Sequence, residues 1–237
     1  VHLYMRIVDK GEGKSFNPVR KVGHGDPQIE KLPHTELRRQ YYQRVKDAGG
    51  CMMCFSLFAE GEVLPKLPRG PAFDGRMEQY PPYSSATGRN VLRVWKSREE
   101  LWGTATRIEQ ELGVNYSAVL WTRDDAYWMD NIVNPAVLLE AENSERTVWS
   151  RNCAAWFGIN DKSVFLGREA APVMLAAYSS FFQPTPAMNS SFNAEVYLKQ
   201  LAMTNQLLLR PLPFKDLPNS DGVDGLPRVG EFAAAAE

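Results

Sequence analysis

Apolar and polar residues follow one another along this chain in patterns that predict separate strands and helices. Residues 1–8 are rich in β-branched and aromatic side chains and stop at a cluster of Gly and Lys, which is typical of a strand. Residues 35–48 carry apolar side chains at four-residue spacing before Gly49, which predicts a helix with its C-terminal stop. Residues 51–58 form an apolar run short enough for a buried strand.

The clearest pattern is a helix followed directly by a strand. Ser97 and Glu100 have the S-x-x-E spacing of a capping box, in which each side chain satisfies a free backbone amide at a helix start. Apolar residues then recur on one helical face up to Gly113, and residues 117–122 form an apolar strand. A helix followed by a buried strand is the repeating unit of a parallel sheet covered by helices. We therefore predict an α/β fold with a mostly parallel central sheet, helices on both faces and 117–122 as an interior strand.

The rest of the chain completes a single predicted domain over residues 1–214. The proline-rich residues 65–83 predict no regular element. Downstream, the pattern predicts a short strand and two helices (164–166, 168–182 and 195–209). Residues 215–237 are rich in Pro, Gly and Asp and are expected to form a flexible tail. Because the sequence opens at Val1 inside a strand-like run, we expect a trimmed protein.

The composition excludes several classes of function. Lys plus Arg (27) nearly balance Asp plus Glu (28) and form no basic run, so neither nucleic-acid binding nor contact with a membrane surface is expected. No apolar run approaches the length that crosses a bilayer. The three histidines all precede residue 35 and no G-x-S-x-G motif is present, which disfavours the commonest hydrolases. Carboxylates with a hard metal ion are then the natural chemistry.

Two adjacent aspartates, Asp124 and Asp125, follow Arg123 at the carboxyl end of the predicted strand 117–122. Ligands of α/β sheets bind beyond the carboxyl ends of the strands. A carboxylate pair suits Mg²⁺ or Mn²⁺, which takes further oxygens from a diphosphate and stabilises it as a leaving group. The alternative is that both aspartates only solvate the strand end, with Arg123 as their ion-pair partner.

From residue 88 to residue 214 the chain resembles nucleotide-sugar-dependent glycosyltransferases of the A-type fold, of the Golgi type and of algal or viral kinds. The resemblance lies in the order of four motifs. These are an R-x-D element at 123–125 followed by Tyr127 and Trp128, a G-x-N-D-[KR] element at 158–162, the pair Gly167 and Arg168, and a closing helix that opens with Glu195. The resemblance implies that the strand opening this fold is missing before Val1.

The resemblance also implies roles for single residues. Asp125, with Asp124 as a second contact, would bind Mn²⁺ or Mg²⁺ and, with Arg123, the donor diphosphate. Asp161 would be the base that takes the acceptor proton, with Asn160 beside it.

Three further residues are candidates for the acceptor side: Trp128, Trp156 and Glu195. Aromatic faces stack on sugars, although most tryptophans of this chain are expected in the core. A helix dipole offers an alternative explanation for the acids at 161 and 195, because an acid in the first turn of a helix stabilises that dipole.

We therefore expect an enzyme that transfers a sugar from a nucleotide-sugar donor to a glycan or protein hydroxyl. One alternative is a non-catalytic module of the same fold that binds nucleotide sugars or glycans, because the acidic motif is R-D-D where the family has D-x-D. Another is a metal-dependent phosphoesterase that uses Asp124, Asp125 and Asp161. The expected compartment is the Golgi lumen for a trimmed type II membrane enzyme and the cytoplasm for a viral or bacterial one.

Overall fold

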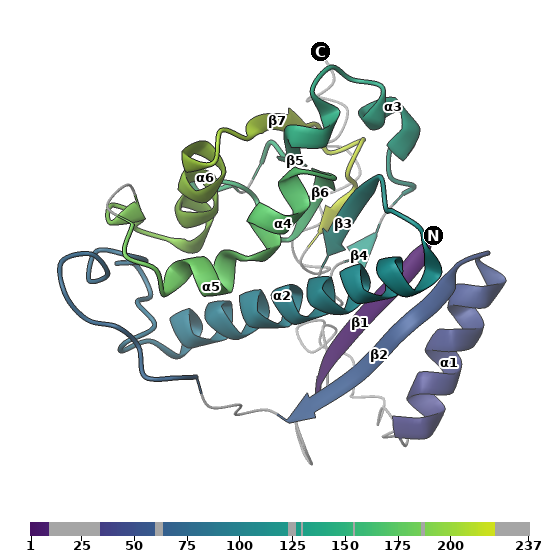
Figure 1. Cartoon of the computed structure of the whole chain (residues 1–237), viewed down its shortest axis with the longest axis horizontal. Helices are drawn as coiled ribbons and strands as arrows, with labels where there is room; N and C mark the ends of the chain where they lie inside the picture. Colours follow the sequence, from purple (N-terminus) through teal and green to yellow (C-terminus); the bar gives the residue numbers. More distant parts are fainter. Residues whose placement is uncertain are drawn as a thin grey trace, which may run out of the picture.

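The computed structural model describes residues 1–9, 34–59, 64–122, 127–128, 130–153, 155–185 and 188–220, and it shows a mixed α/β chain (Figure 1). The largest sheet has four strands, in the spatial order β3 (Ala118–Thr122), β6 (Ser163–Gly167), β5 (Thr147–Arg151) and β7 (Leu208–Leu212). Two smaller pairs accompany it: the parallel pair β1 (His2–Asp9) and β2 (Cys51–Ala59), and the antiparallel pair β4 (Tyr127–Trp128) and β8 (Asn219–Ser220).

The four-stranded sheet is mixed in direction, which corrects the prediction of a mostly parallel sheet. β6 is antiparallel to both β3 and β5, whereas β5 and β7 are parallel. β3, β5 and β7 therefore point the same way, but β6 runs against them between β3 and β5. All five residues of β6 are buried, so it takes an interior place. β3, predicted as interior, is the outer strand of this sheet among the described strands, and three of its five residues are only partly buried.

Helices cover both faces of this sheet. Alternate side chains of the central strands point to opposite faces. On one face Val164 and Leu166 join the larger core, and on the other face Phe165 joins a second cluster with Leu138. The larger core packs under four helices: α2 (Ala86–Leu112), α4 (Ala170–Leu175), α5 (Ala177–Phe181) and α6 (Ala194–Thr204). The second cluster lies under α3 (Pro135–Leu139), which a short 3-10 turn (Ser144–Arg146) follows.

Helix α2 begins about three turns earlier than the sequence predicted. Ser85 is the N-cap, and its side chain accepts a hydrogen bond from the backbone N–H of Gly88. Ser97 and Glu100 lie inside the helix, so the predicted capping box is wrong; the same i, i+3 spacing also occurs within helices. The predicted stop is confirmed at Gly113, whose φ of 65° is in the left-handed region that glycine adopts most easily.

The other elements follow the predictions with shifted ends. The first predicted strand, helix and second strand are present as β1, α1 (His34–Asp47) and β2, and α1 packs on β2. The helix predicted over 168–182 is divided at Ala176 into α4 and α5. The helix predicted over 195–209 ends at Thr204, and its last residues enter β7. Of the predicted tail, residues 215–220 are described and include β8, whereas 221–237 lie outside the described residues.

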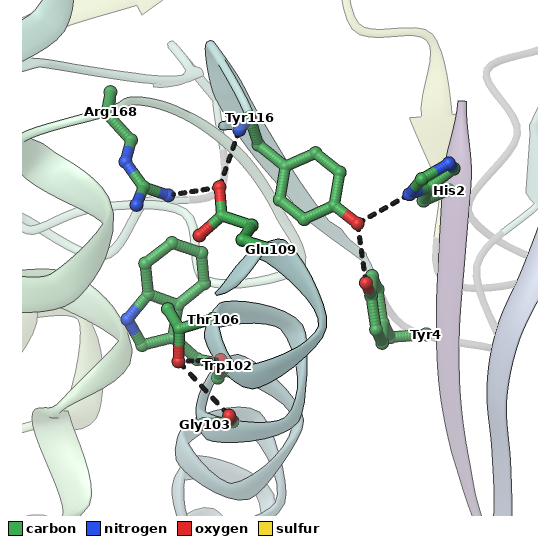
Figure 2. A network of polar contacts seen from close by, with 8 residues as sticks. All are labelled: His2, Tyr4, Trp102, Gly103, Thr106, Glu109, Tyr116 and Arg168. Carbon is green, nitrogen blue, oxygen red and sulfur yellow. Dashed lines mark hydrogen bonds and ion pairs between the residues drawn. The ribbon is translucent and has the colours of Figure 1, made fainter. Parts of the chain in front are cut away.

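A buried carboxylate near the end of α2 holds this helix to neighbouring segments, as Figure 2 shows. The side chain of Glu109 is only 3% exposed, and its Oε1 accepts hydrogen bonds from Arg168 Nη1 (2.9 Å) and from the Tyr116 backbone N–H (2.5 Å). The Tyr116 hydroxyl in turn lies 2.5 Å from His2 Nδ1 and 2.6 Å from the Tyr4 hydroxyl. Burial raises the pKa of Tyr4, so its hydroxyl stays neutral. One polar network therefore links β1, α2 and the end of β6.

We expect Arg168→Ala to lower the free energy of unfolding by about 2–3 kcal/mol, because it leaves the buried Glu109 charge without its ionic partner. This loss of unfolding free energy should be smaller than for a fully buried ion pair, because the Arg168 side chain is 33% exposed. Arg107→Ala is the matched control: it removes an i, i+4 pair with Glu111 whose side chains are 61% and 56% exposed, and should cost about 0.5 kcal/mol or less. Urea denaturation measures both values, and equal costs would contradict a structural role for the buried pair.

Candidate functional site

One edge of the four-stranded sheet adjoins the 158–162 turn, which contains Asn160 and Asp161. β3 and β5 end at this edge and β6 begins there, because β6 is antiparallel to both. Thr122, the last residue of β3, is paired with Ser163, the first residue of β6, and their hydroxyl oxygens are 2.7 Å apart. The 158–162 turn leads directly into β6, so it lies at the edge where β3 ends.

Several predicted site residues lie outside the described part of the chain. These are Arg123, Asp124 and Asp125, which follow Thr122 in the sequence. The backbone of Trp128 is described in β4, where it pairs with Asn219, but its side chain is not. Among the described residues, no group of three or more His, Cys, Asp or Glu is placed to hold a metal ion. The predicted metal site therefore rests on Asp124 and Asp125.

Asn160 braces the 158–162 turn from within. It is 1% exposed, its Nδ2 donates to the carbonyl oxygen of Cys153 (2.8 Å), and its Oδ1 accepts from the backbone N–H of Lys162 (3.1 Å). An amide that satisfies the backbone on both sides fixes the path of the chain around the next residue. Asn160 therefore positions Asp161.

The backbone of Asp161 is held by two side chains from other elements. Its carbonyl oxygen accepts hydrogen bonds from Arg98 Nη2 of α2 (2.8 Å) and from Trp121 Nε1 of β3 (3.2 Å). The Arg98 guanidinium also lies over the Trp121 ring, 4.4 Å from its centroid. Within the described part of the chain the Asp161 carboxylate makes no hydrogen bond or ion pair, and the residue is partly buried. The backbone of Asp161 is thus fixed from two elements of the fold.

The helix-dipole explanation of Asp161 is wrong, because Asp161 precedes a strand and not a helix. Glu195, in contrast, does lie in the first turn of α6, two residues after the N-cap Asn193. Burial raises the pKa of the Glu195 carboxyl, and the negative charge of Asp161 raises it further, whereas Lys162 lowers it. Glu195 and Asp161 are therefore close enough for their charges to interact, which brings two sequence-predicted residues into one site.

A close approach of two backbones joins the turn to α6. A Cβ atom at Gly158 would overlap the backbone of Glu195, so only glycine fits at this position. The next residue, Ile159, donates its backbone N–H to the Glu195 carbonyl oxygen (3.0 Å). This steric limit explains why the G-x-N-D-K motif has glycine at position 158.

Trp121 and Trp149 are core residues, as expected for most tryptophans of this chain; they are 5% and 2% exposed. Trp156 is 64% exposed and stands next to the turn, where its carbonyl oxygen accepts a hydrogen bond from Asn193 Nδ2 (3.1 Å). Sequence reasoning missed Arg98, because an arginine on a helix carries no local signal of a contact 63 residues away. It also missed Phe157, the exposed neighbour of Trp156.

Comparison of this chain with models of protein families, with curated proteins and with solved structures gave no match. None of the helices in the described ranges is both long enough and apolar enough to span a bilayer.

The raised pKa of Glu195 predicts a pH-dependent effect on stability. Folded Glu195 holds its proton more tightly than the unfolded chain, so its contribution is complete below the ordinary pKa of 4.5 and is lost as the pH rises through the folded pKa. We therefore expect Glu195→Gln, which has no charge to bury, to gain thermal stability over the parent between pH 4.5 and neutral pH, and to show no gain below pH 4.5.

Melting temperatures of the parent and the variant across this pH range measure the effect. The control is Glu142→Gln, which removes an exposed carboxylate and should show no such pH-dependent gain. A difference between Glu195→Gln and the parent that is the same at every pH would refute the burial effect.

Proposed function

We propose that this chain is a nucleotide-sugar-dependent glycosyltransferase of the A-type fold that transfers a sugar to a hydroxyl group. The observation that carries the proposal is the Asp161 carboxylate, which makes no hydrogen bond or ion pair among the described residues although its backbone is held by Arg98 and Trp121. Asp161 stands at the sheet edge where β3 ends with Thr122. The R-D-D motif follows Thr122 directly in the sequence. This is the edge at which α/β sheets bind ligands.

Asp161 suits the role of general base. A base must keep its carboxylate accessible to the acceptor hydroxyl and must not swing away from it. The hydrogen bonds to its carbonyl oxygen fix the backbone from which the carboxylate projects, and no donor among the described residues competes for that carboxylate. The acceptor oxygen would lose its proton to Asp161 as it forms the new bond to the donor sugar.

The donor side of the proposal rests on Arg123, Asp124 and Asp125. A divalent cation held by Asp125 and Asp124 would stabilise the nucleoside diphosphate as it leaves. Arg123 would add a fixed positive charge and a fork of N–H donors toward the same diphosphate oxygens. A carboxylate base and a cationic diphosphate site are the two parts that transfer from a nucleotide sugar to a hydroxyl requires.

We expect Asp161→Asn to lower turnover by about 10²–10⁴-fold with little change in donor affinity, because the amide keeps the shape of the side chain but takes no proton. Release of nucleoside diphosphate from a panel of nucleotide sugars measures turnover. Asp47→Asn is the control: it makes the same change on an exposed residue of α1 and should keep full turnover. An Asp161→Asn variant as active as the parent would contradict the role of base.

We expect binding of uridine or guanosine diphosphate to depend on Mn²⁺ in the parent and to lose that dependence in Asp125→Ala. Removing one of two adjacent carboxylates weakens the bound cation and, with it, the diphosphate. Calorimetric titration with and without Mn²⁺ measures the effect. Equal affinity of the parent and the variant would refute the metal site, and binding without any turnover would identify the non-catalytic alternative.

A further inference from the structure

Three exposed aromatic side chains make up a patch: Trp156 and Phe157 directly precede the 158–162 turn in the chain, and the Phe192 ring packs with that of Phe157. Trp156, Phe157 and Phe192 are 64%, 83% and 37% exposed. The Phe157 and Phe192 rings are neighbours, with centroids 6.2 Å apart and planes tilted by 54°. Single exposed apolar side chains are ordinary, but a neighbouring pair of exposed rings, with a third exposed aromatic residue adjacent in the chain, indicates a binding surface.

Two of these aromatic residues have a strained backbone conformation. Trp156 and Phe157 have φ values of 42° and 70°, in the left-handed region that aromatic residues rarely adopt. Both strained residues are tied to α6 and its N-cap: Asn193 Nδ2 donates to the Trp156 carbonyl oxygen (3.1 Å), and Lys199 Nζ donates to that of Phe157 (3.3 Å). Strain of this kind persists where the surrounding structure enforces it, and it gathers at ligand sites.

The size of the patch favours a small ligand over a second copy of the chain. Three aromatic side chains with these exposures offer on the order of 350 Å² of surface. A stable dimer buries about 800 Å² on each partner. The patch also adjoins the turn that carries Asp161, because Gly158 follows Phe157 in the chain and its backbone lies against that of Glu195.

A sugar has one surface that suits an aromatic ring and another that suits a carboxylate. A pyranose ring has an apolar face of C–H groups, which stacks on an aromatic ring, and an edge of hydroxyls, which donate to carboxylates. We propose that Trp156, Phe157 and Phe192 are the platform on which the accepting sugar stacks, so that the acceptor is a glycan and not a protein hydroxyl. This inference rests on the proposed function, since Asp161 would then face the hydroxyl of the stacked sugar.

Saturation-transfer NMR with four methyl glycosides (β-galactoside, β-glucoside, α-mannoside and β-xyloside) tests the platform. We expect the parent to bind at least one of them, and Trp156→Ala, Phe157→Ala and Phe192→Ala each to weaken that binding about tenfold or more. Phe157→Tyr keeps the ring and should keep the affinity. The control is Met203→Ala, which removes an equally exposed apolar side chain (60%) near the end of α6 and should change nothing.

Three outcomes would overturn the inference. A parent that binds none of the glycosides leaves a protein hydroxyl as the acceptor. Folded Ala variants that all keep the parent affinity place the sugar elsewhere. A parent that is a dimer, and that Phe157→Ala turns into a monomer, assigns the patch to a second copy of the chain.

The result separates this inference from the proposed function, because titration of the parent with nucleoside diphosphate is a separate measurement. Nucleotide binding without glycoside binding refutes the platform alone. If the parent binds a glycoside through these rings but binds no nucleotide, the proposed transferase is refuted. The chain would then be a glycan-binding module that uses the same aromatic platform.

Discussion

The contact between Gly158 and the first turn of α6 is the constraint on which the candidate site depends. The two backbones lie so close that no side chain fits between them, and the Ile159 N–H is bonded to the Glu195 carbonyl oxygen. This contact brings the backbone of Glu195 against the turn that carries Asp161, and Trp156 and Phe157 directly precede Gly158 in the chain. The charged and the aromatic parts of the site therefore have one steric origin. Any residue larger than glycine at position 158 would displace both.

The opposite side of the turn is fixed by the sheet and by α2. Arg98 and Trp121 reach the Asp161 carbonyl oxygen from different elements, and their stacked side chains limit each other's motion. The Asn160 amide is hydrogen-bonded to the backbone on both sides. The carboxylate of Asp161, in contrast, makes no hydrogen bond among the described residues. A rigid backbone around one available carboxylate is the arrangement that lowers the entropic cost of orienting a reacting group.

Local patterns predicted most elements, but not how they pair. The strands at 1–8, 51–58 and 164–166 and the stop at Gly113 follow from composition and periodicity over a few residues. The reversed direction of β6 does not, because apolar residues alone do not tell which neighbour a buried strand takes. The start of α2 was missed because two Ser residues compete as caps, and Ser85 is preferred where the proline-rich segment ends. In the site, Asp161 and Glu195 were found from motif order, whereas Arg98 and Phe157 act through contacts that appear only in three dimensions.

The reversal of β6 has a consequence for the order in which the protein folds. β5 and β6 are joined by eleven residues and pair antiparallel, so they can form a hairpin before distant segments arrive. The pairings of β6 with β3 and of β5 with β7 join residues some forty to sixty positions apart and close much longer loops. The turn that carries Asp161 lies within the connection of that hairpin. We therefore expect this turn to form on the most local part of the sheet, before α2 and α6 pack against it.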